Sequence, residues 1–512
     1  LIKRTDTQTA YSSWMSYHRA GSATGTVAFL NTTNFFFANS RSWFGDGSSA
    51  VAPTDTVFTI NGGSSNYLNT SGATYIVYLF AHDAGGFGDD GDESIIKCGS
   101  YTGTGTVDTL SINLGFEPQW IMVKSATTAQ SWYIQDVMRG MHVPATPSAP
   151  VAGKTLSANT SASESTNKKW FYPTATGVRA YDNEIEYNQS GQTYIYIAIR
   201  RPMKTPESGT EVFDPTVYTG NSSTQSITGF GFSPDLSILK SRIQGYPENV
   251  YDRLRGATKQ LVTPYASAES TQSTGLTSFD QDGITIGALN QINTSAFSHI
   301  SWNFKRATGF FDVVAYSGNG TAGATQAHNL GVVPELMIVK SRSNGAYNWM
   351  VYHHSLGNTN YLRLNETTQT LATAGAWNNT TPTDSEFTLG GASVTNGSGE
   401  TFIAYLFATV AGVSKVGSYT GTGSNVDVDC GFSAGARFIF IKRTDSTGDW
   451  YVWDSERGIV AGNDPYLLLN SADAEVTSTD YIDPLSSGFT VTSSAPAALN
   501  ASGGTYIFLA IA

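Results

Sequence analysis

The stretch GFEPQWIMVKS, residues 115–125, decides the fold class of this chain. A glycine and a proline mark a turn, and the run that follows is apolar at successive positions and ends in a single lysine. Such a run is typical of a strand in the middle of a sheet, because both of its faces contact other protein. The same pattern returns as GFSPDLSILKS (231–241) and GVVPELMIVKS (331–341), and without the proline as GFSAGARFIFIKR (431–443).

A second motif fixes the repeat length. It reads Asn-x-Ser-Gly-x-Thr-aromatic-Ile and begins at Asn69, Asn188, Asn396 and Asn500, with a degraded copy at Asn293. Successive copies lie about a hundred residues apart. This period suits whole domains in tandem better than the short units of a solenoid.

The heptapeptide GSYTGTG occurs at 99–105 and again at 417–423. A glycine loop that binds phosphate would follow a strand and begin a helix. Both copies instead run into segments that alternate apolar and polar residues, TVDTLSINLGF and SNVDVDCGF, which is typical of strands. We therefore interpret these glycines as turn residues of a repeated domain.

The composition excludes several classes of protein. Only 14% of the residues are charged, 12% are aromatic and 52 of 512 are glycine, which favours short strands and tight turns over helices. A formal net charge of -12 without a basic patch argues against a nucleic-acid partner. The longest apolar runs have the length of a strand, so we expect no membrane insertion. Two cysteines cannot form a disulfide framework.

We predict an all-β chain of tandem antiparallel β-sandwich repeats, jelly-roll-like, of about 100 residues each. The opening LIKRTD aligns with FIKRTD at 440–445, so we expect the chain to begin inside a strand of an incomplete repeat and to be an excerpt of a longer polypeptide. The predicted parts are a partial sandwich without its N-terminal strands (1–85), an acidic glycine-rich linker (86–93) and sandwiches at 94–204, 205–309, 310–412 and 413–512.

Two polar features recur with the repeat. One is the lysine that ends each central strand, at Lys124, Lys240, Lys340 and Lys442. The other is Asp-x-x-Arg-Gly, at Asp136/Arg139, Asp252/Arg255 and Asp454/Arg457. We interpret the second as a turn fixed by an Asp–Arg or Asp–Lys pair, with the strand-end lysine in reach, rather than as a ligand site.

The sequence contains no recognisable catalytic group. The seven histidines fall at different positions of the repeat, and neither GxSxG nor HExxH occurs. The paired carboxylates of a glycosidase are distant in sequence, so this alternative stays open. We predict no catalytic residues and no enzymatic activity.

Two sets of residues are candidate ligand sites. Asp89, Asp90 and Asp92 have the oxygen density that Ca²⁺ requires, although their spacing is not that of an EF-hand and a solvated acidic linker is the alternative. Calcium is the one cofactor that the sequence leaves open. Trp349 and Trp377 are flanked by asparagines and are our candidates for exposed aromatics that stack on sugars, with core packing as the alternative.

The phrases FGDDGDESIIKCGSYTG, GFEPQWIMVKS and TYIYIAIRRPMK resemble a repeat module of unassigned function that is common in tail-fibre and other virion-appendage proteins of marine bacteriophages. The resemblance covers most of the chain and is densest at 84–204. The family offers no catalytic residues to carry over. The resemblance implies a virion surface protein.

These observations predict a structural and adhesive protein of a phage tail fibre or similar appendage that contacts host-surface glycans. The expected location is a virion or extracellular appendage. A subunit of an extracellular filament or bacterial surface appendage is the main alternative, and a polysaccharide-degrading tailspike is the third. The expected partners are copies of the chain itself, as a homotrimer or filament that covers exposed sheet edges, other virion proteins and host-surface glycans.

Overall fold

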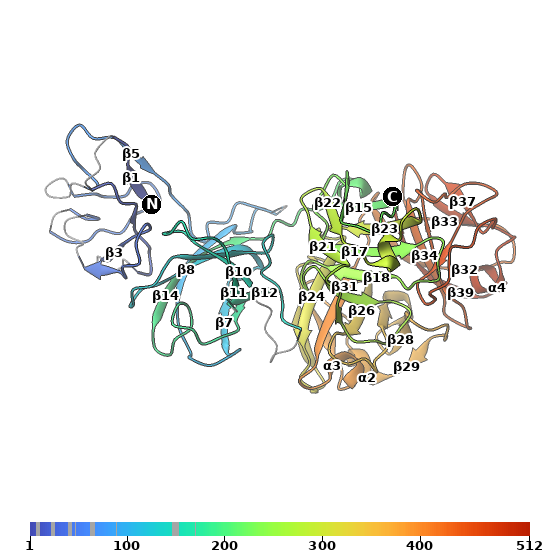
Figure 1. The fold of residues 1–512 in the computed structure, drawn as a ribbon. Coiled ribbons are helices and arrows are strands. Elements are labelled where there is room, and N and C mark those ends of the chain that lie inside the picture. The colour runs from blue at the N-terminus through green and yellow to red at the C-terminus, as the bar shows by residue number, and fades with distance from the viewer. Residues whose placement is uncertain are drawn as a thin grey trace. The chain divides into compact units, whose positions relative to one another are not determined.

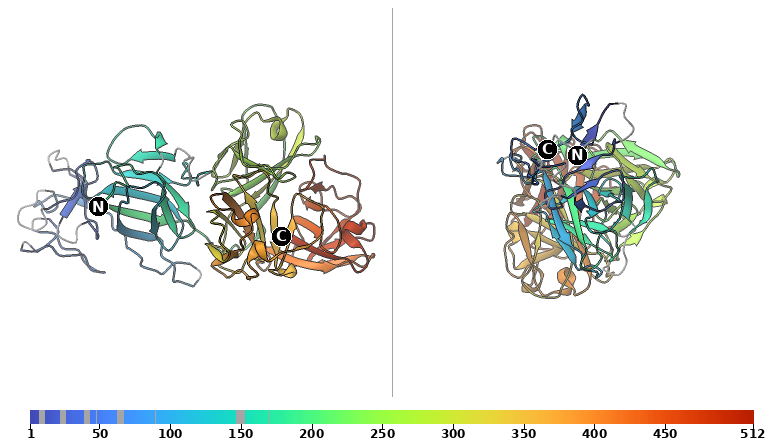
Figure 2. Two further views of the ribbon diagram at one scale, coloured as in Figure 1. Left: turned by 90° about the horizontal axis from the view of Figure 1, so that it is seen from below. Right: turned by 90° about the vertical axis from the view of Figure 1, so that its left-hand side faces the viewer.

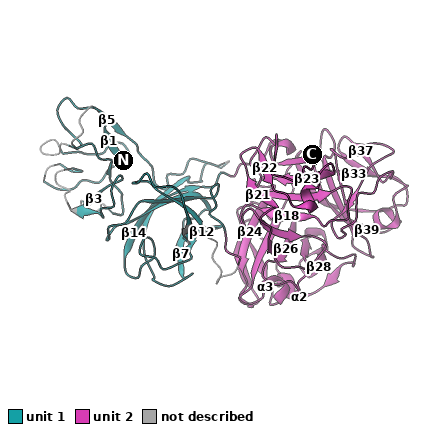
Figure 3. Cartoon of the chain, viewed as in Figure 1, with its two compact units in different colours: residues 1–142, 150–202 teal, residues 143–149, 203–512 magenta. Residues whose placement is uncertain are grey.

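The structure is a computed structural model that describes residues 1–6, 11–21, 26–38, 43–46, 48–61, 67–88, 90–145, 153–168 and 170–512 (Figure 1). The chain forms two compact units (Figure 3). Unit 1 contains residues 1–142 and 150–202, and unit 2 contains residues 143–149 and 203–512. No helix in the described ranges is long and apolar enough to cross a membrane.

The prediction of an all-β chain of tandem antiparallel sandwiches is confirmed. Strands hold 39% of the residues and helices 5%, and every pairing between strands is antiparallel among the residues that the structure describes. We number the sandwiches along the chain as the first (1–85), second (94–204), third (205–309), fourth (310–412) and fifth (413–512).

The third sandwich shows the complete topology. Its larger sheet has the order β15-β23-β17-β18-β19-β20, and its smaller sheet has the order β16-β22-β21. The strands are β15 (Phe213–Thr219), β16 (Gln225–Thr228), β17 (Leu236–Ser241), β18 (Asn249–Asp252), β19 (Lys259–Val262), β20 (Ser270–Thr271), β21 (Leu276–Phe279), β22 (Gly283–Ile286) and β23 (Ser298–Phe304). β17 is the buried central strand that the GFSPDLSILKS pattern predicts.

The second, fourth and fifth sandwiches repeat this plan. In the second the larger sheet is β11-β10-β9-β8-β14-β6 and the smaller is β12-β13-β7. Its strands are β6 (Ile96–Thr102), β7 (Leu110–Asn113), β8 (Pro118–Ser125), β9 (Tyr133–Asp136), β10 (Gly153–Ser157), β11 (Ser165–Lys168), β12 (Phe171–Thr174), β13 (Gly177–Ala180) and β14 (Thr193–Arg200).

In the fourth sandwich the larger sheet is β24-β31-β26-β27-β28-β29 and the smaller is β25-β30. In the fifth they are β32-β39-β34-β35-β36 and β33-β38-β37. The strands are β24 (Phe311–Ser317), β25 (Ala324–Ala327), β26 (Leu336–Ser341), β27 (Met350–His353), β28 (Asn360–Arg363), β29 (Leu371–Ala372), β30 (Glu386–Leu389), β31 (Thr401–Phe407), β32 (Ser414–Thr420), β33 (Val426–Asp429), β34 (Phe438–Arg443), β35 (Trp450–Asp454), β36 (Leu467–Leu468), β37 (Ile482–Leu485), β38 (Gly488–Val491) and β39 (Thr505–Ile511).

The first sandwich contributes one sheet, in the order β4-β3-β2-β1-β5. Within the described residues this sheet has no strand beyond β5 in the place of β6 or β15, and no second sheet covers it. The strands are β1 (Ile2–Arg4), β2 (Met15–Ser16), β3 (Thr26–Phe29), β4 (Phe37–Ala38) and β5 (Tyr75–Val77). The helices in the described part of the chain are single turns, namely α1 (Asn290–Asn293), α2 (Ala374–Trp377), α3 (Ser393–Asn396), α4 (Ala497–Asn500) and the 3-10 turns η2 (Gly209–Glu211) and η3 (His354–Leu356).

The asparagine of the repeat motif joins the two sheets of a sandwich. Asn500 accepts a hydrogen bond from the main-chain nitrogen of Thr422 (2.9 Å) and donates to the carbonyls of Ser424 (2.8 Å) and Thr492 (2.9 Å). The chain passes so closely here that a Cβ on Gly421 would lie 2.5 Å from a main-chain oxygen. Asn188, Asn293 and Asn396 hold the same place in the other complete sandwiches. The glycines of the YTG turns are therefore packing residues.

Each complete sandwich has its own core between its two sheets. In unit 2 the outer faces of the three larger sheets also meet in one shared core, which includes Trp302, Phe304, Tyr405, Phe407 and Leu509. Figure 2 shows the three sandwiches of this unit grouped around a common centre. Burial of these large side chains is the main force that holds the three sandwiches together.

Candidate functional site

The strand-end lysines lie at the contacts between sandwiches. All four are fully buried. In unit 2 the Nζ atoms donate to main-chain carbonyls of a neighbouring sandwich, Lys240 to Ala472 (2.9 Å), Lys340 to Ala266 (2.9 Å) and Lys442 to Thr367 (2.8 Å). In unit 1 Lys124 reaches Thr33 of the first sandwich (3.1 Å). Each of these carbonyls follows the end of an equivalent strand by four residues, so one contact is built four times.

These contacts close a ring in unit 2. The fourth sandwich docks on the third, the fifth docks on the fourth, and the third docks on the fifth. Burial lowers the pKa of Lys340 to about 7 and the pKa values of Lys124 and Lys442 to about 8, because desolvation disfavours the ammonium. The lysines thus act as buried connectors between sandwiches.

A tryptophan accompanies three of these lysines. The indole Nε1 donates to the last carbonyl of a strand in the neighbouring sandwich, from Trp132 to Phe29 (2.9 Å), from Trp349 to Val262 (3.0 Å) and from Trp450 to Arg363 (3.0 Å). In the third sandwich Glu248 takes the tryptophan position and forms an ion pair with Lys240 (3.2 Å). The sequence did not reveal this role, because an aromatic residue on a strand fits a core as well as a ligand site.

The three predicted Asp–Arg pairs are present in the structure, and each holds its turn. Arg139 Nε lies 2.5 Å from Asp136 Oδ2, Arg457 Nε lies 2.5 Å from Asp454 Oδ2, and Arg255 bonds Asp252 in the same way. The strand-end lysines bind neighbouring carbonyls rather than these aspartates. A third group, Glu269 or Glu475, completes the cluster in the third and fifth sandwiches.

The clusters also bind across the ring, which the sequence analysis missed. Arg342 of the fourth sandwich pairs with Glu269 of the third (2.9 Å), and Arg242 of the third pairs with Glu475 of the fifth (2.8 Å). These partners are 73 and 233 residues apart in the chain. The only sequence signal was an arginine two residues after the lysine in both donor sandwiches.

In unit 2 a hydrogen-bond donor from the shared core reaches each aspartate of the two Asp–Arg turns. Tyr405 OH donates to Asp252 Oδ2 (2.7 Å), and Trp302 Nε1 donates to Asp454 Oδ2 (2.8 Å). At the contact between the fourth and fifth sandwiches, His353 takes the place of the aspartate, and Leu509 takes the place of Trp302 or Tyr405. A polar donor from one sandwich is therefore found where the next sandwich has an aspartate, and a leucine is found where the aspartate is absent.

The prediction that Trp349 and Trp377 are exposed is wrong. Both side chains are buried, Trp349 in the shared core and Trp377 in the core of the fourth sandwich. Trp377 Nε1 donates to the carbonyl of Asn360 (3.1 Å). The flanking Asn348 and Asn378 are half-buried, and the indole rings lie in apolar surroundings that stabilise them.

The acidic stretch near residue 90 gives no cation site in the described part of the chain. No group of three or more His, Cys, Asp or Glu side chains with the geometry to hold a metal occurs among the described residues. Asp90 and Asp92 are described, and Asp89 lies outside the described residues. The turn is closed by a bridge between Phe87 and Glu93.

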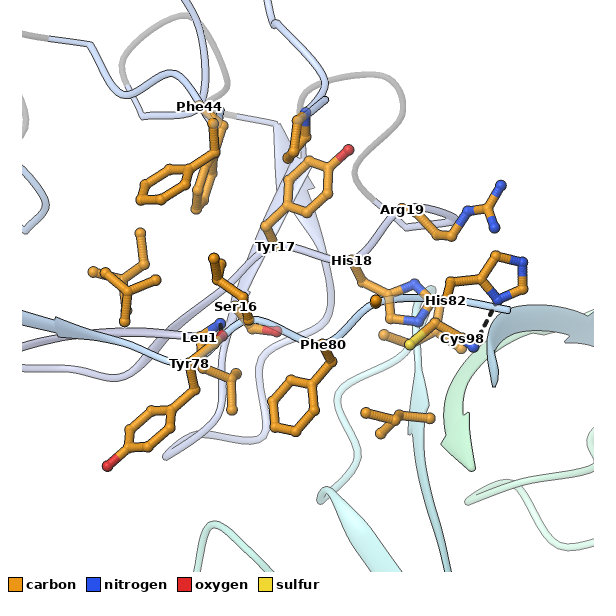
Figure 4. Close-up of a pocket in the computed structure, with 18 of the residues that line it drawn as sticks. Leu1, Ser16, Tyr17, His18, Arg19, Phe44, Tyr78, Phe80, His82 and Cys98 are labelled. Atoms are coloured by element: carbon orange, nitrogen blue, oxygen red, sulfur yellow. Dashed lines mark hydrogen bonds between the residues drawn. The ribbon is translucent and has the colours of Figure 1, made fainter. Parts of the chain in front are cut away.

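One cavity of about 600 Å³ lies in unit 1 between the first and second sandwiches (Figure 4). Its walls include the aromatic rings of Tyr17, Phe44, Tyr78 and Phe80. At one end His18 Nε2 lies 3.0 Å from the carbonyl of Tyr196, and His82 Nδ1 accepts a hydrogen bond from the main-chain nitrogen of Cys98 (3.1 Å). The cavity is thus mainly apolar.

The cavity lacks an activated nucleophile. Burial raises the pKa of the Cys98 thiol to about 11, so the thiol is protonated at neutral pH. Burial also lowers the pKa of His18. Elsewhere, burial raises the pKa of Asp464 and of Glu248 to about 7, but both side chains are fully buried and no substrate reaches them.

Comparison with known proteins gives a family without an assigned activity. A family model described as a domain of unknown function, DUF7483, matches residues 1–202 and again residues 208–512. The first match spans the two sandwiches of unit 1 and the second spans the three sandwiches of unit 2. No curated protein matches the chain.

Proposed function

The chain belongs to the DUF7483 family, a domain of unknown function, and we propose that it is a structural and adhesive repeat protein of a virion appendage such as a phage tail fibre. One observation carries this proposal. In unit 2 the recurrent polar groups form bonds that join one sandwich to the next, through the buried lysines and through the clusters of Asp252 and Arg255 with Glu269 and of Asp454 and Arg457 with Glu475. A chain that repeats its connectors rather than a reactive site is suited to carrying load.

We propose that attachment to host glycans lies in the loops that differ between sandwiches. The loop at 373–384 combines a buried residue with exposed ones. Trp377 packs in the core, whereas Asn379, Thr380 and Thr381 are exposed and available to a ligand. Rigid sandwiches that carry variable polar loops separate stability from recognition. Several such loops on one particle would turn weak sugar contacts into useful avidity.

Immunogold labelling of purified phage particles tests the proposal. Antibodies against this chain should decorate a tail appendage in negatively stained images. Labelling of free filaments or of the bacterial surface without phage would support the filament alternative instead. A purified chain that releases reducing ends from the host polysaccharide would overturn the non-enzymatic part of the proposal.

A further inference from the structure

We propose that unit 1 is two-thirds of a closed ring of the kind seen in unit 2, and that its two open faces bind one further β-sandwich of the same repeat type. The proposal rests on contacts that are occupied in unit 2 and open in unit 1. It concerns assembly and does not depend on the proposed host-binding role.

The two sandwiches of unit 1 correspond to the fourth and fifth sandwiches of unit 2. The first has His18 and Tyr78 where the fourth has His353 and Tyr405. The second has Asp136, Arg139 and Glu164 where the fifth has Asp454, Arg457 and Glu475. The contact between them is the same too, because Lys124 and Trp132 dock on the first sandwich as Lys442 and Trp450 dock on the fourth.

The first open face carries Lys3 and Trp14. The main-chain nitrogen of Trp14 bonds Asn31, as that of Trp349 bonds Asn365, so the local structure is the same. Lys3 Nζ donates to the carbonyl of Ser12 within its own sandwich. Both side chains are nevertheless half-buried, whereas the other four strand-end lysines are fully buried. In unit 2 a neighbouring sandwich covers the corresponding Lys340 and Trp349, and unit 1 has no sandwich at this face among its described residues.

The face continues across the sheet to the residues that would enter a shared core. Ile76, Tyr78 and Phe80 are 39%, 46% and 47% exposed, whereas the corresponding Ile403, Tyr405 and Phe407 are at most 4% exposed. Tyr78 and Phe80 line the cavity of unit 1 (Figure 4). The corresponding Tyr405 and Phe407 belong to the shared core of unit 2. Exposed apolar surface of this kind marks a binding face.

The absence of a strand beyond β5 does not explain the exposure of Lys3 and Trp14. Lys3 lies on β1, which is paired on both sides by β2 and β5, and Trp14 directly precedes β2. A first strand in the place of β24 would pair with β5 alone, as β24 pairs with β31.

The second open face lies on the second sandwich, which has both of its sheets. Its Asp136 and Arg139 side chains are 18% and 24% exposed, whereas those of Asp454 and Arg457 are fully buried. Ser161, whose carbonyl corresponds to that of Ala472, is exposed. Glu164 pairs with Arg139 but is 27% exposed, where Glu475 is 4% exposed because Arg242 covers it.

The open groups specify the chemistry of the occupant. Asp136 requires a tryptophan or tyrosine donor on the strand of the incoming sandwich that corresponds to β23. Glu164 requires an arginine two residues after the strand-end lysine, and Tyr78 requires an aspartate acceptor. The third sandwich has all three, in Trp302, Arg242 and Asp252. The occupant is therefore a sandwich with the side chains of residues 205–309.

A second copy of this chain does not supply that sandwich. In unit 2 the docking surface of each sandwich is occupied by another member of its own ring. The two sandwiches of unit 1 have Thr5 and Ala126 where an arginine is required, and the turn of the first is occupied by Trp132 and Lys124. The occupant is therefore a further β-sandwich of this repeat type, whose counterparts of Trp302, Arg242 and Asp252 are not already bound to other sandwiches.

Side-chain labelling of the unmodified chain is the first test. An amine reagent should modify Lys3 far faster than Lys124, Lys240, Lys340 and Lys442, with the exposed Lys154 and Lys204 as references. Hydroxyl radicals should oxidise Trp14 and Tyr78 but spare Trp349 and Tyr405. Lys3 as unreactive as Lys124 in a monomer would overturn the proposal. So would a dimer, seen by light scattering, in which Lys3 and Arg139 are protected.

A fused chain supplies the occupant. In the first fusion, residues 203–337 are placed directly before Leu1. Because Lys3 aligns with Lys340, this segment adds one complete sandwich (205–309) and the strands that precede β26 in the fourth sandwich. A second fusion carries residues 203–309 and a flexible Gly-Ser linker before Leu1. We expect labelling of Lys3, Trp14, Tyr78 and Arg139 to fall at least tenfold in one or both.

The matched control is the same fusion with Arg242→Glu and Trp302→Ala in the added segment only. Arg139 should then react with an arginine-specific dicarbonyl as it does in the unmodified chain. Protection of Lys340 and Lys442 in unit 2 reports that the remainder is folded. If neither fusion protects Lys3 and Arg139, whether it folds or not, the proposal is wrong.

Discussion

The indole Nε1 of Trp302 donates a 2.8 Å hydrogen bond to Oδ2 of Asp454, although the two residues are 152 positions apart and lie in different sandwiches. The same carboxylate oxygen lies 2.5 Å from Arg457 Nε. All three side chains are buried in the interior of unit 2. A turn that stabilises one sandwich therefore also holds the next.

Trp302→Phe should lower the free energy of unfolding of unit 2. The substitution keeps most of the apolar area but leaves Asp454 short of one buried donor, at a cost of about 1–3 kcal/mol. Calorimetry of the intact chain measures the shift. Tyr405→Phe should behave alike, because Tyr405 donates to Asp252. Tyr78→Phe is the matched control, since Tyr78 is 46% exposed and its loss should change nothing.

The sequence predicted the repeats, the buried central strands and the Asp–Arg turns, because these depend on patterns within one sandwich. It did not predict the ring. Arg242 and Glu475 are 233 residues apart, and nothing local marks them as partners. Trp349 was misjudged for a related reason, since its alternation with apolar neighbours shows only that one face is covered and not that a second sandwich covers it.

Unit 2 should become more stable as the pH rises from about 7 to about 9.5. Burial lowers the pKa of Lys340 to about 7, below its value of about 10.5 in an unfolded chain. The unfolded chain then binds more protons in this window, so the free energy of unfolding increases with pH. Denaturant titrations at several pH values measure the slope.

Lys340→Met is the control for that slope. The variant should be less stable at every pH, because the carbonyls of Ala266 and Tyr347 lose their donor. Its stability should also rise less steeply between pH 7 and 9.5. An unchanged slope would show that Lys340 stays charged in the folded state.

His299→Phe should protect unit 2 from acid. Burial lowers the pKa of His299 to about 4, and the ring is stacked on Tyr218 at 5.3 Å. Since the unfolded imidazole has a pKa near 6.5, stability contributed by the neutral ring is lost as the pH falls from about 6.5 to 4. The fourth sandwich has Phe402 at this position, so phenylalanine fits the fold.

The expected gain of His299→Phe over the parent is about 2 kcal/mol larger at pH 5 than at pH 8. Urea denaturation at the two pH values measures it. An equal effect at both pH values would mean that the imidazole is not forced to stay neutral by burial.

Trp377→Ala and Asn379→Gly separate stability from attachment in the loop at 373–384. Trp377 is fully buried, so its truncation should cost about 3–5 kcal/mol of stability. Asn379 is exposed and has a φ of 50°, a conformation that glycine adopts without strain. Asn379→Gly therefore removes a surface amide and should leave the melting temperature nearly unchanged.

Binding of the two variants to host cells then decides what the loop does. Weaker attachment by Asn379→Gly, with normal melting, would place a glycan contact on the exposed tip. Loss of attachment by Trp377→Ala alone would follow from unfolding of the fourth sandwich and would say nothing of sugar stacking. If Asn379→Gly attaches as the parent does, and the neighbouring Thr380→Ala and Thr381→Ala do as well, recognition lies in another loop or in another protein of the particle.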